Sequence, residues 1–308
     1  MKAHLIYNPV AGPWNVRPAL KKVTTSLKHS GWEVVLRLTE RPGDATTLAC
    51  EAVQAGCDVA VVVGGDGTVN EAVNGLVGTQ TALAVLPAGT GNMWAKQLGL
   101  ATYTLIHPFR LREAAANLTE ATIRPVDVGR VNGRYFLCWA GIGLDAQVTT
   151  EMEPRRRSTK RLGALPYAIA AVLVACDFRG VYTRIWLDGE IVRGRALLIL
   201  VANIQQYTMF NVAREARIDD GLFDVFLFKG LGISYAAGHL LKIISQRYLR
   251  DPEVVHRQAR RVEIRSQETL PVQVDGDPIG ATPVTLEIVP CALRVLVPPN
   301  APSALFTS

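Results

Sequence analysis

The 308-residue sequence lacks the features that mark several common protein classes. Its five cysteines are scattered and form no C-x-x-C pair, so neither a disulfide framework nor a zinc site is predicted, and a reducing compartment fits best. The histidines are isolated and give no H-E-x-x-H spacing, which argues against a zinc enzyme. No G-x-S-x-G elbow is present, which argues against a hydrolase of that type.

Long apolar runs are also absent. The longest covers residues 162–176, contains Pro166, and falls short of the ~20 residues that span a bilayer. The first residues run into Asn8-Pro9 without the apolar core of a signal peptide. We therefore expect a cytoplasmic protein, with peripheral attachment to the inner face of the membrane left open. Basic residues are not interleaved with aromatic ones, so nucleic acid is not an expected partner.

The composition is that of a globular protein, and the length allows two domains. Apolar residues make up 49% and charged residues 19% of the sequence. The net charge of +6 suits an anionic partner such as ATP or an acidic membrane surface.

Residues 1–125 alternate short apolar runs with amphipathic stretches. We expect strands at 3–7, 33–38, 59–63 and 81–86, and helices at 17–30, 44–55 and 68–76. The run Val59-Ala60-Val61-Val62-Val63 is typical of a parallel strand buried on both faces. The alternation predicts a three-layer α/β domain with a parallel sheet.

Residues 126–297 differ in texture and predict a predominantly antiparallel second domain. Turn pairs such as Asp188-Gly189 and Asp275-Gly276 separate short strands. Strands are expected at 134–139, 182–187, 190–194, 196–202, 222–228, 261–266, 272–274, 286–289 and 293–297, and helices at 162–177 and 234–248. Residues 298–308 are expected to form a loosely held tail.

The turn Gly64-Gly65-Asp66-Gly67-Thr68 follows the buried strand and precedes a helix. Its glycines let backbone N–H groups approach phosphate oxygens, and the helix contributes the positive end of its dipole. Among those donors, Asp66 favours a divalent cation as an additional partner. No G-x-x-x-x-G-K-[ST] loop exists in the chain.

Two further turns follow strands in the same sense, at residues 8–12 and 87–92. Because the carboxyl ends of parallel strands meet at one edge of a sheet, we expect the three turns to line one ligand site.

These motifs together resemble the diacylglycerol kinase catalytic-domain family of bacterial lipid kinases, which are relatives of sphingosine and ceramide kinases. The residues that carry the resemblance are Asn8-Pro9-x-x-Gly12, Gly64 to Glu71 with Asn74-Gly75, Pro87-x-Gly89-Thr90-x-Asn92, Ala140 to Ala146, Asp219-Asp220-Gly221 and Val274-Asp275-Gly276-Asp277. They occur in order from residue 4 to about residue 297.

The resemblance implies an ATP-dependent lipid kinase in which ATP and lipid meet between a nucleotide-binding α/β domain and a larger β-sandwich-like domain. Its implied nucleotide contacts are Asn8, Pro9, Val10, Ala11, Gly12, Thr39, Gly64, Gly65, Asp66, Gly67, Thr68, Val69, Asn70 and Thr90. It also implies a Mg²⁺ ion held by the Asp220 side chain and by main-chain oxygens of Arg217 and Leu222. The implied proton acceptor is Asp275.

The sequence departs from the family pattern at two positions. Many members carry aspartate directly after the asparagine of the third motif, where Met93 stands here, which puts the metal network around Asn92 in doubt. Asp277 replaces the usual glutamate and keeps its charge. At the lipid end, Arg155, Arg156 and Arg157 precede the apolar run and are candidates for contact with anionic lipid, with a solvated charge run as the alternative.

Two other functions remain open. Gly-Gly-Asp-Gly-Thr also occurs in NAD kinases, so a kinase of a soluble acceptor is one alternative. An inactive regulatory protein that binds ATP and lipid is the other. The acceptor lipid is not specified by the motifs, and the resemblance leaves a homodimer open.

Overall fold

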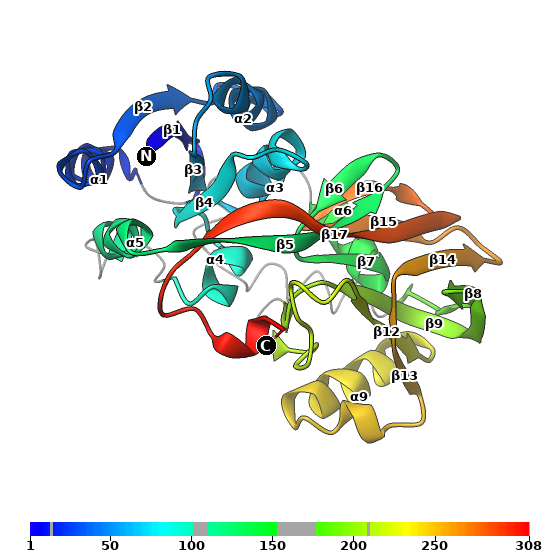
Figure 1. The fold of residues 1–308 in the computed structure, drawn as a ribbon. Coiled ribbons are helices and arrows are strands. Elements are labelled where there is room, and N and C mark those ends of the chain that lie inside the picture. Colours follow the sequence, from blue (N-terminus) through cyan, green and yellow to red (C-terminus); the bar gives the residue numbers. More distant parts are fainter. Residues whose placement is uncertain (13–14, 101–109, 153–176, 208–209, 308) are drawn as a thin grey trace. The chain divides into compact units, whose positions relative to one another are not determined.

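In the computed structural model the chain divides into two compact units, and the structure describes residues 1–12, 15–100, 110–152, 177–207 and 210–307 (Figure 1). Unit 1 comprises Met1–Val128 and Pro290–Ser308, and unit 2 comprises Gly129–Val289. Both boundaries fall within strands, β5 (Thr122–Val131) and β17 (Val284–Val297). The arginines at 155–157 and almost all of the helix expected at 162–177 lie outside the described residues.

The sheet of unit 1 has the strand order β17-β4-β3-β1-β2, and these neighbours pair in parallel. The remaining strands are β1 (Lys2–Tyr7), β2 (Glu33–Leu38), β3 (Val59–Gly64) and β4 (Ala82–Pro87). Every residue of β3 and β4 is buried, as continuous apolar runs require in a sheet that is covered on both faces. The parallel sheet expected from the sequence is therefore confirmed.

The described residues of unit 1 include the helices α1 (Arg17–His29), α2 (Asp44–Gln54), α3 (Asp66–Leu76), α4 (Met93–Gln97) and α5 (Arg110–Thr119). Helix α1 packs on α5 and α2 packs on α3, and Figure 1 shows the two pairs on opposite sides of the sheet. Strands β2 and β3 lie on opposite sides of β1, so the strand order reverses there. Open α/β sheets bind ligands at such a reversal, beside the loops that leave the carboxyl ends of the two strands.

Unit 2 is built on an antiparallel sheet. Its elements are β6 (Arg134–Phe136), β7 (Trp139–Gly143), α6 (Leu144–Met152), β8 (Val181–Leu187), β9 (Glu190–Ala202), β10 (Gln206–Tyr207), β11 (Phe210–Asn211), β12 (Phe223–Lys229), α9 (Gly232–Ile244), η1 (Tyr248–Arg250), β13 (Val254–Ala259), β14 (Arg261–Ser266), β15 (Pro271–Val274) and β16 (Asp277–Ala281). The long strand β9 pairs with β8 along its first half and with β7 and β12 along its second. Phe136, Phe223 and Ile264 are among the fully buried side chains of its core.

Four expectations differ from the structure. Residues 134–139 form two strands instead of one, whereas 190–202 and 284–297 each form one strand instead of two. The last residues do not form a loose tail: Leu305 is fully buried in the short helix η2 (Ser303–Leu305), and the Arg124 guanidinium lies 4.0 Å from the centre of the Phe306 ring. Within the described residues, no helix is long and apolar enough to cross a membrane.

Candidate active site

The turns after β1 and β3 are joined by hydrogen bonds from Asn8. Its backbone N–H donates to the Val63 carbonyl at 3.0 Å, and its side-chain Nδ2 donates to Thr68 Oγ1 at 2.9 Å. Its Oδ1 accepts the Val10 N–H at 3.0 Å, which folds the chain back toward Gly12. The asparagine therefore fixes the first glycine turn against the start of α3.

The third turn lies against the other two through backbone contacts that exclude side chains. The Gly89 N–H donates to the Gly64 carbonyl at 3.1 Å. A Cβ on Gly12, whose φ is +65°, would lie 2.1 Å from the Ala88 oxygen, and one on Gly89 would lie 2.3 Å from the Gly65 Cα. The structure thus brings together the three turns that the sequence placed at one edge of the sheet.

Gly67 differs from these glycines. It is exposed, and a Cβ at this position would meet no protein atom within 4 Å. Packing within the described residues therefore does not explain why a glycine stands there. Gly67 lies in the first turn of α3, whose N-cap residue Gly65 makes no side-chain capping bond. Backbone N–H groups at an uncapped helix start bind anions such as phosphate.

Asp66 is turned into unit 1, where its carboxylate binds the start of α4. Its Oδ1 accepts the Met93 N–H at 2.6 Å. Burial raises the pKa of the Asp66 carboxyl, and the N–H groups of Met93, Asn92 and Trp94 oppose that rise. The sequence favoured a divalent cation at Asp66. In the structure its carboxylate accepts backbone N–H groups at the start of α4, and the additional cation stays a prediction.

Replacing Asp66 by asparagine should remove a pH dependence of stability. Burial raises the folded-state pKa of Asp66 above its ordinary value of 3.8, so between these two values the folded chain binds more protons than the unfolded chain. The free energy of unfolding of the wild type should therefore fall as pH rises from about 3.8 through the raised pKa. The neutral asparagine lacks this fall but still offers an oxygen to Met93. Urea unfolding across the acidic range measures both proteins.

The matched variant Asp66→Ala removes the acceptor as well as the charge. Without an acceptor for the α4 N–H groups, it should lose about 1 kcal/mol of stability at neutral pH. If wild type and Asp66→Asn show the same dependence on pH, the raised pKa is wrong.

Two more residues of unit 1, Thr39 and Thr90, were predicted to contact the nucleotide. Thr39 follows β2, is buried, and donates its N–H to the Tyr7 carbonyl at 3.0 Å. Thr90 is exposed in the third turn. Met93 stands at the position where aspartate was expected from the resemblance. It is buried and carries no charge.

In unit 2, the Asp275 carboxylate is bound by a row of backbone N–H groups. Leu137 donates to Oδ2 at 2.7 Å, while Cys138 and Trp139 donate to Oδ1 at 2.9 and 3.0 Å. Asp275 itself has a φ of +48° and precedes Gly276 at +89°. These charge-assisted bonds hold the carboxylate in one orientation.

The Asp188-Gly189 hairpin has closely similar geometry. Asp188 has a φ of +49°, and its carboxylate accepts N–H bonds from Arg260 and Arg261. The backbone conformation and hydrogen bonds of Asp275 are therefore those that an Asp-Gly turn also has elsewhere in this chain. They do not by themselves assign Asp275 as the proton acceptor.

Sequence reasoning missed Gln273, which supports the Asp275 turn from the side. Its Nε2 donates to Asp145 Oδ2 at 2.6 Å, and its Oε1 accepts the Gly276 N–H at 2.8 Å. Gly141 leaves room for this pair, because a Cβ there would lie 2.2 Å from Asp145 Oδ2. The sequence did contain a signal for the pair of Gln273 and Asp145, because Gly141 and Asp145 both lie in the segment Ala140 to Ala146 that carries the resemblance. Asp277 forms an ion pair with Arg134.

The predicted metal residues of unit 2 lie in the turn before β12. Asp220 Oδ1 accepts the Leu222 N–H at 3.0 Å, and Gly221 has a φ of +71°. Arg217 is exposed. A carboxylate beside main-chain carbonyls is a donor set of the kind that Mg²⁺ accepts.

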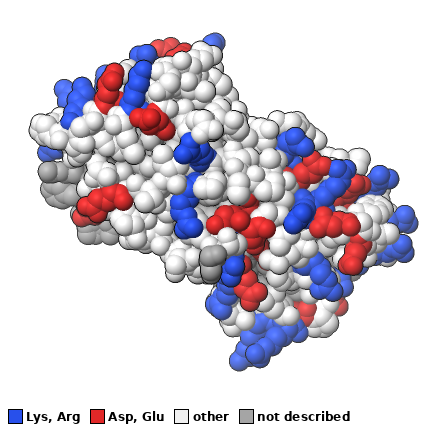
Figure 2. All heavy atoms as spheres, viewed as in Figure 1, with Lys and Arg blue, Asp and Glu red and all other residues white. Residues whose placement is uncertain are grey.

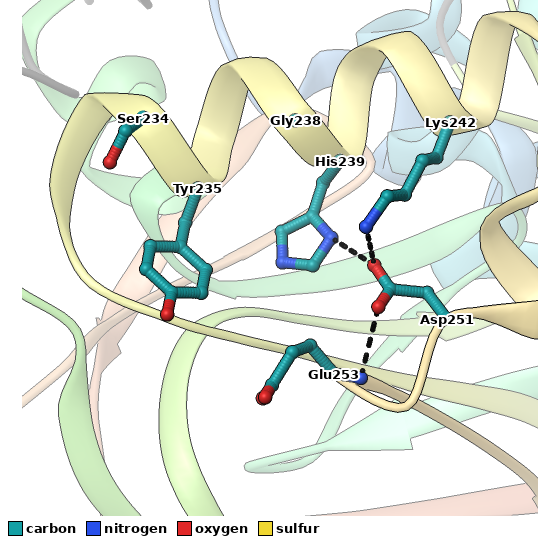
Figure 3. Close-up of a pocket in the computed structure, with 7 residues that line it drawn as sticks. All are labelled: Ser234, Tyr235, Gly238, His239, Lys242, Asp251 and Glu253. Atoms are coloured by element: carbon teal, nitrogen blue, oxygen red, sulfur yellow. Dashed lines mark hydrogen bonds and ion pairs between the residues drawn. The ribbon is translucent and has the colours of Figure 1, made fainter.

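A small pocket of about 210 Å³ lies beside α9 in unit 2 (Figure 3). None of the predicted site residues lines it. Its lining consists of Ser234, Tyr235, Gly238, His239, Lys242, Asp251 and Glu253.

Both halves of the chain match known protein families. Residues 2–131 match the diacylglycerol kinase catalytic domain, and residues 139–297 match the YegS C-terminal NAD kinase beta sandwich-like domain. The diacylglycerol kinase of Staphylococcus carnosus is 30% identical over 92% of this chain and 90% of its own length. The diacylglycerol kinase of Bacillus subtilis is 29% identical over 92% and 91%.

Solved structures agree with these matches. A crystal structure of a diacylglycerol kinase from Bacillus anthracis covers 98% of both chains with a TM-score of 0.72 and 25% identity. Another structure from the same organism has a TM-score of 0.81 with 26% identity, over 98% of this chain and 96% of that one. Glycine turns at the reversal of a parallel sheet, followed by a β-sandwich-like unit, define a two-domain kinase. The chain belongs to the diacylglycerol kinase family of lipid kinases.

Proposed function

We propose that this protein transfers the γ-phosphate of ATP to a hydroxyl group of a diacylglycerol-like lipid. The use of ATP is supported above all by Gly67, which lies at the start of α3 beside the three glycine turns. Contacts within the described residues do not require a glycine there, and the helix start has no side-chain cap. The lipid half is supported by relatives named diacylglycerol kinase that match over most of this chain.

The phosphates of ATP bind at the three glycine turns. Backbone N–H groups of residues 64–70 take the phosphate oxygens, and the segment Asn8–Gly12 covers them from the side. Thr39 and Thr90 contribute further polar contacts. Because hydrogen bonds already hold Asn8 and Thr68 together, little ordering of this part of the site accompanies binding.

The Asp220 carboxylate and main-chain oxygens of Arg217 and Leu222 would hold Mg²⁺. The ion would supply positive charge that offsets charge on the phosphates during transfer. Gly221, with a φ of +71°, lets the chain turn directly after Asp220.

Asp275 acts as the general base. In the proposed step the lipid oxygen attacks the γ-phosphorus, the bond from that phosphorus to the ADP oxygen breaks, and the hydroxyl proton passes to Asp275. Three backbone N–H groups donate to its carboxylate. The same bonds orient the base, and Gln273 fixes the Gly276 end of the turn.

A panel of acceptors with labelled ATP tests the proposal. Diacylglycerol, phosphatidylglycerol, a sphingoid base, undecaprenol and NAD are each offered to the purified protein. We expect label on diacylglycerol. Label on NAD alone would overturn the lipid assignment. Binding of ATP without transfer to any acceptor in a single turnover would show an inactive regulatory protein.

A further inference from the structure

Helix α9 of unit 2 carries an apolar stripe on its outward side. Ile233, Ala237, Leu240, Leu241 and Ile244 are all exposed, and their spacing places them within about 100° of the helix surface. Leu241 is 66% exposed and Ile244 is 55% exposed. These are among the most exposed large apolar side chains of the described residues.

The side of the helix that faces the pocket carries Tyr235, His239 and Lys242 (Figure 3). His239 is its buried residue and bonds through Nε2 to the Lys229 carbonyl at 2.7 Å. Lys242 donates to Asp251 Oδ2 at 2.6 Å. A surface helix of a globular protein ordinarily buries its apolar stripe and exposes its polar one. In α9 the polar His239 is buried and Ala236 and Ile243 are half-buried, whereas Leu240, Leu241 and Ile244 are exposed.

The segment that carries α9 holds cations and no acidic residue, and the acidic residues Asp251 and Glu253 lie on the pocket side of the helix. Between Asp224 and Asp251 the sequence contains no acidic residue. It contains the cations Lys229, Lys242, Arg247 and Arg250. Arg247 and Arg250 are exposed just beyond the C-terminal end of the helix. Figure 2 shows Lys and Arg atoms gathered over this end of unit 2.

An apolar stripe with cations beside it fits an anionic lipid surface. Helices with this pattern lie in the interface plane, with aliphatic side chains in the headgroup–acyl boundary and cations at the anionic headgroups. A two-fold contact between two copies through α9 would instead bring like charges together without an acidic partner in the segment. The stripe also lacks the aromatic anchors that dominate protein–protein contacts.

We propose that α9 docks this protein on an anionic phospholipid bilayer. Leu240, Leu241 and Ile244 enter the acyl boundary, and Arg247 and Arg250 bind the headgroups. The proposal rests on membership of a lipid kinase family, whose acceptor is carried by a membrane, and it names the surface that brings the enzyme there.

Flotation with vesicles tests the docking surface. The vesicles contain phosphatidylcholine with or without phosphatidylglycerol. The double variant Leu241→Ser/Ile244→Ser should lower binding to the anionic vesicles at least about tenfold, because two buried aliphatic side chains are lost. The control Ile191→Ser removes an apolar side chain that is 47% exposed elsewhere in unit 2, and should bind as wild type does.

A second pair of variants tests the cations without touching the stripe. Arg247→Gln should weaken binding about fivefold, which corresponds to one headgroup charge, and Arg193→Gln, at another exposed arginine of unit 2, should not. Wild-type binding that is equal with and without phosphatidylglycerol, or unchanged in the double variant, overturns the proposal. If the double variant binds vesicles normally but converts a wild-type dimer to a monomer, a second copy covers α9.

The same variants separate this proposal from the proposed function. With short-chain diacylglycerol in neutral detergent micelles, the α9 variants should turn over as wild type does. If the wild type transfers no phosphate to any lipid, the proposed function fails, whereas the flotation result still decides whether α9 binds the bilayer.

Discussion

The variant Asp275→Asn should lower kcat by about 10²- to 10⁴-fold while KM for ATP changes little. A general base contributes rate enhancement of that order, and the amide cannot take up the hydroxyl proton. Asparagine tolerates the left-handed backbone at this position. Its oxygen can still accept the Cys138 and Trp139 N–H groups, so the turn should survive. Initial rates with diacylglycerol in micelles measure the effect.

The hairpin at Asp188 supplies a matched control. It has the same residue pair, almost the same φ and the same kind of backbone bonds, so Asp188→Asn imposes the same local change. It should leave kcat unchanged. If Asp275→Asn also leaves kcat unchanged, Asp275 is a turn residue and the base lies elsewhere.

The variant Gly67→Ala should raise KM for ATP at least about tenfold without loss of stability. Its new methyl group meets no protein atom, so the cost appears only when phosphate approaches the backbone. Alanine also favours a helix over glycine by roughly 0.5–1 kcal/mol, so the melting temperature should stay level or rise. ATP titration in the micellar assay and thermal unfolding measure the two quantities.

Gly238 in α9 is the control for this substitution, because a Cβ there also meets nothing within 4 Å. Gly238→Ala should give a comparable change in melting temperature and no change in KM. An unchanged KM in Gly67→Ala would mean that phosphate does not approach the start of α3.

The sequence predicted the parallel sheet well because its signals there are local. The buried run at 59–63 carries no polar residue that could place it at an edge, and the strand begins at Val59 as expected. The position of the three turns followed from the topology of parallel strands, and their contacts through Asn8 and Gly89 agree with it.

Long-range hydrogen bonds account for the misplaced strand ends. The strand expected at 134–139 is interrupted because the Leu137 and Cys138 N–H groups bind Asp275, far along the chain. The opposite error occurred at Pro290-Cys291, where a break was expected. Cys291 has a φ of +51°, yet its N–H donates to Asp127 Oδ1 at 2.7 Å, and β17 continues through the irregularity. Local sequence patterns do not predict hydrogen bonds between residues so far apart in the chain.

The orientation of Asp66 could not be predicted for a related reason. Its carboxylate binds α4, a helix of five residues that follows the left-handed Asn92 and was not expected. The interaction uses the Met93 backbone, so the identity of that side chain gives no hint of it. The side chain of Asp66 thus stabilises the fold, while its backbone belongs to the turn that we propose binds phosphate.

The split of unit 1 between the two ends of the chain bears on how the protein folds during synthesis. Domains usually form as their residues leave the ribosome. Unit 2 is continuous and is complete once Val289 has emerged, whereas unit 1 still lacks Pro290–Ser308. Until then, β4 keeps an open edge where β17 will pair, and the partners of Leu305 stay uncovered. The nucleotide-binding unit, although synthesised first, should therefore be the last to become resistant to protease on a stalled nascent chain.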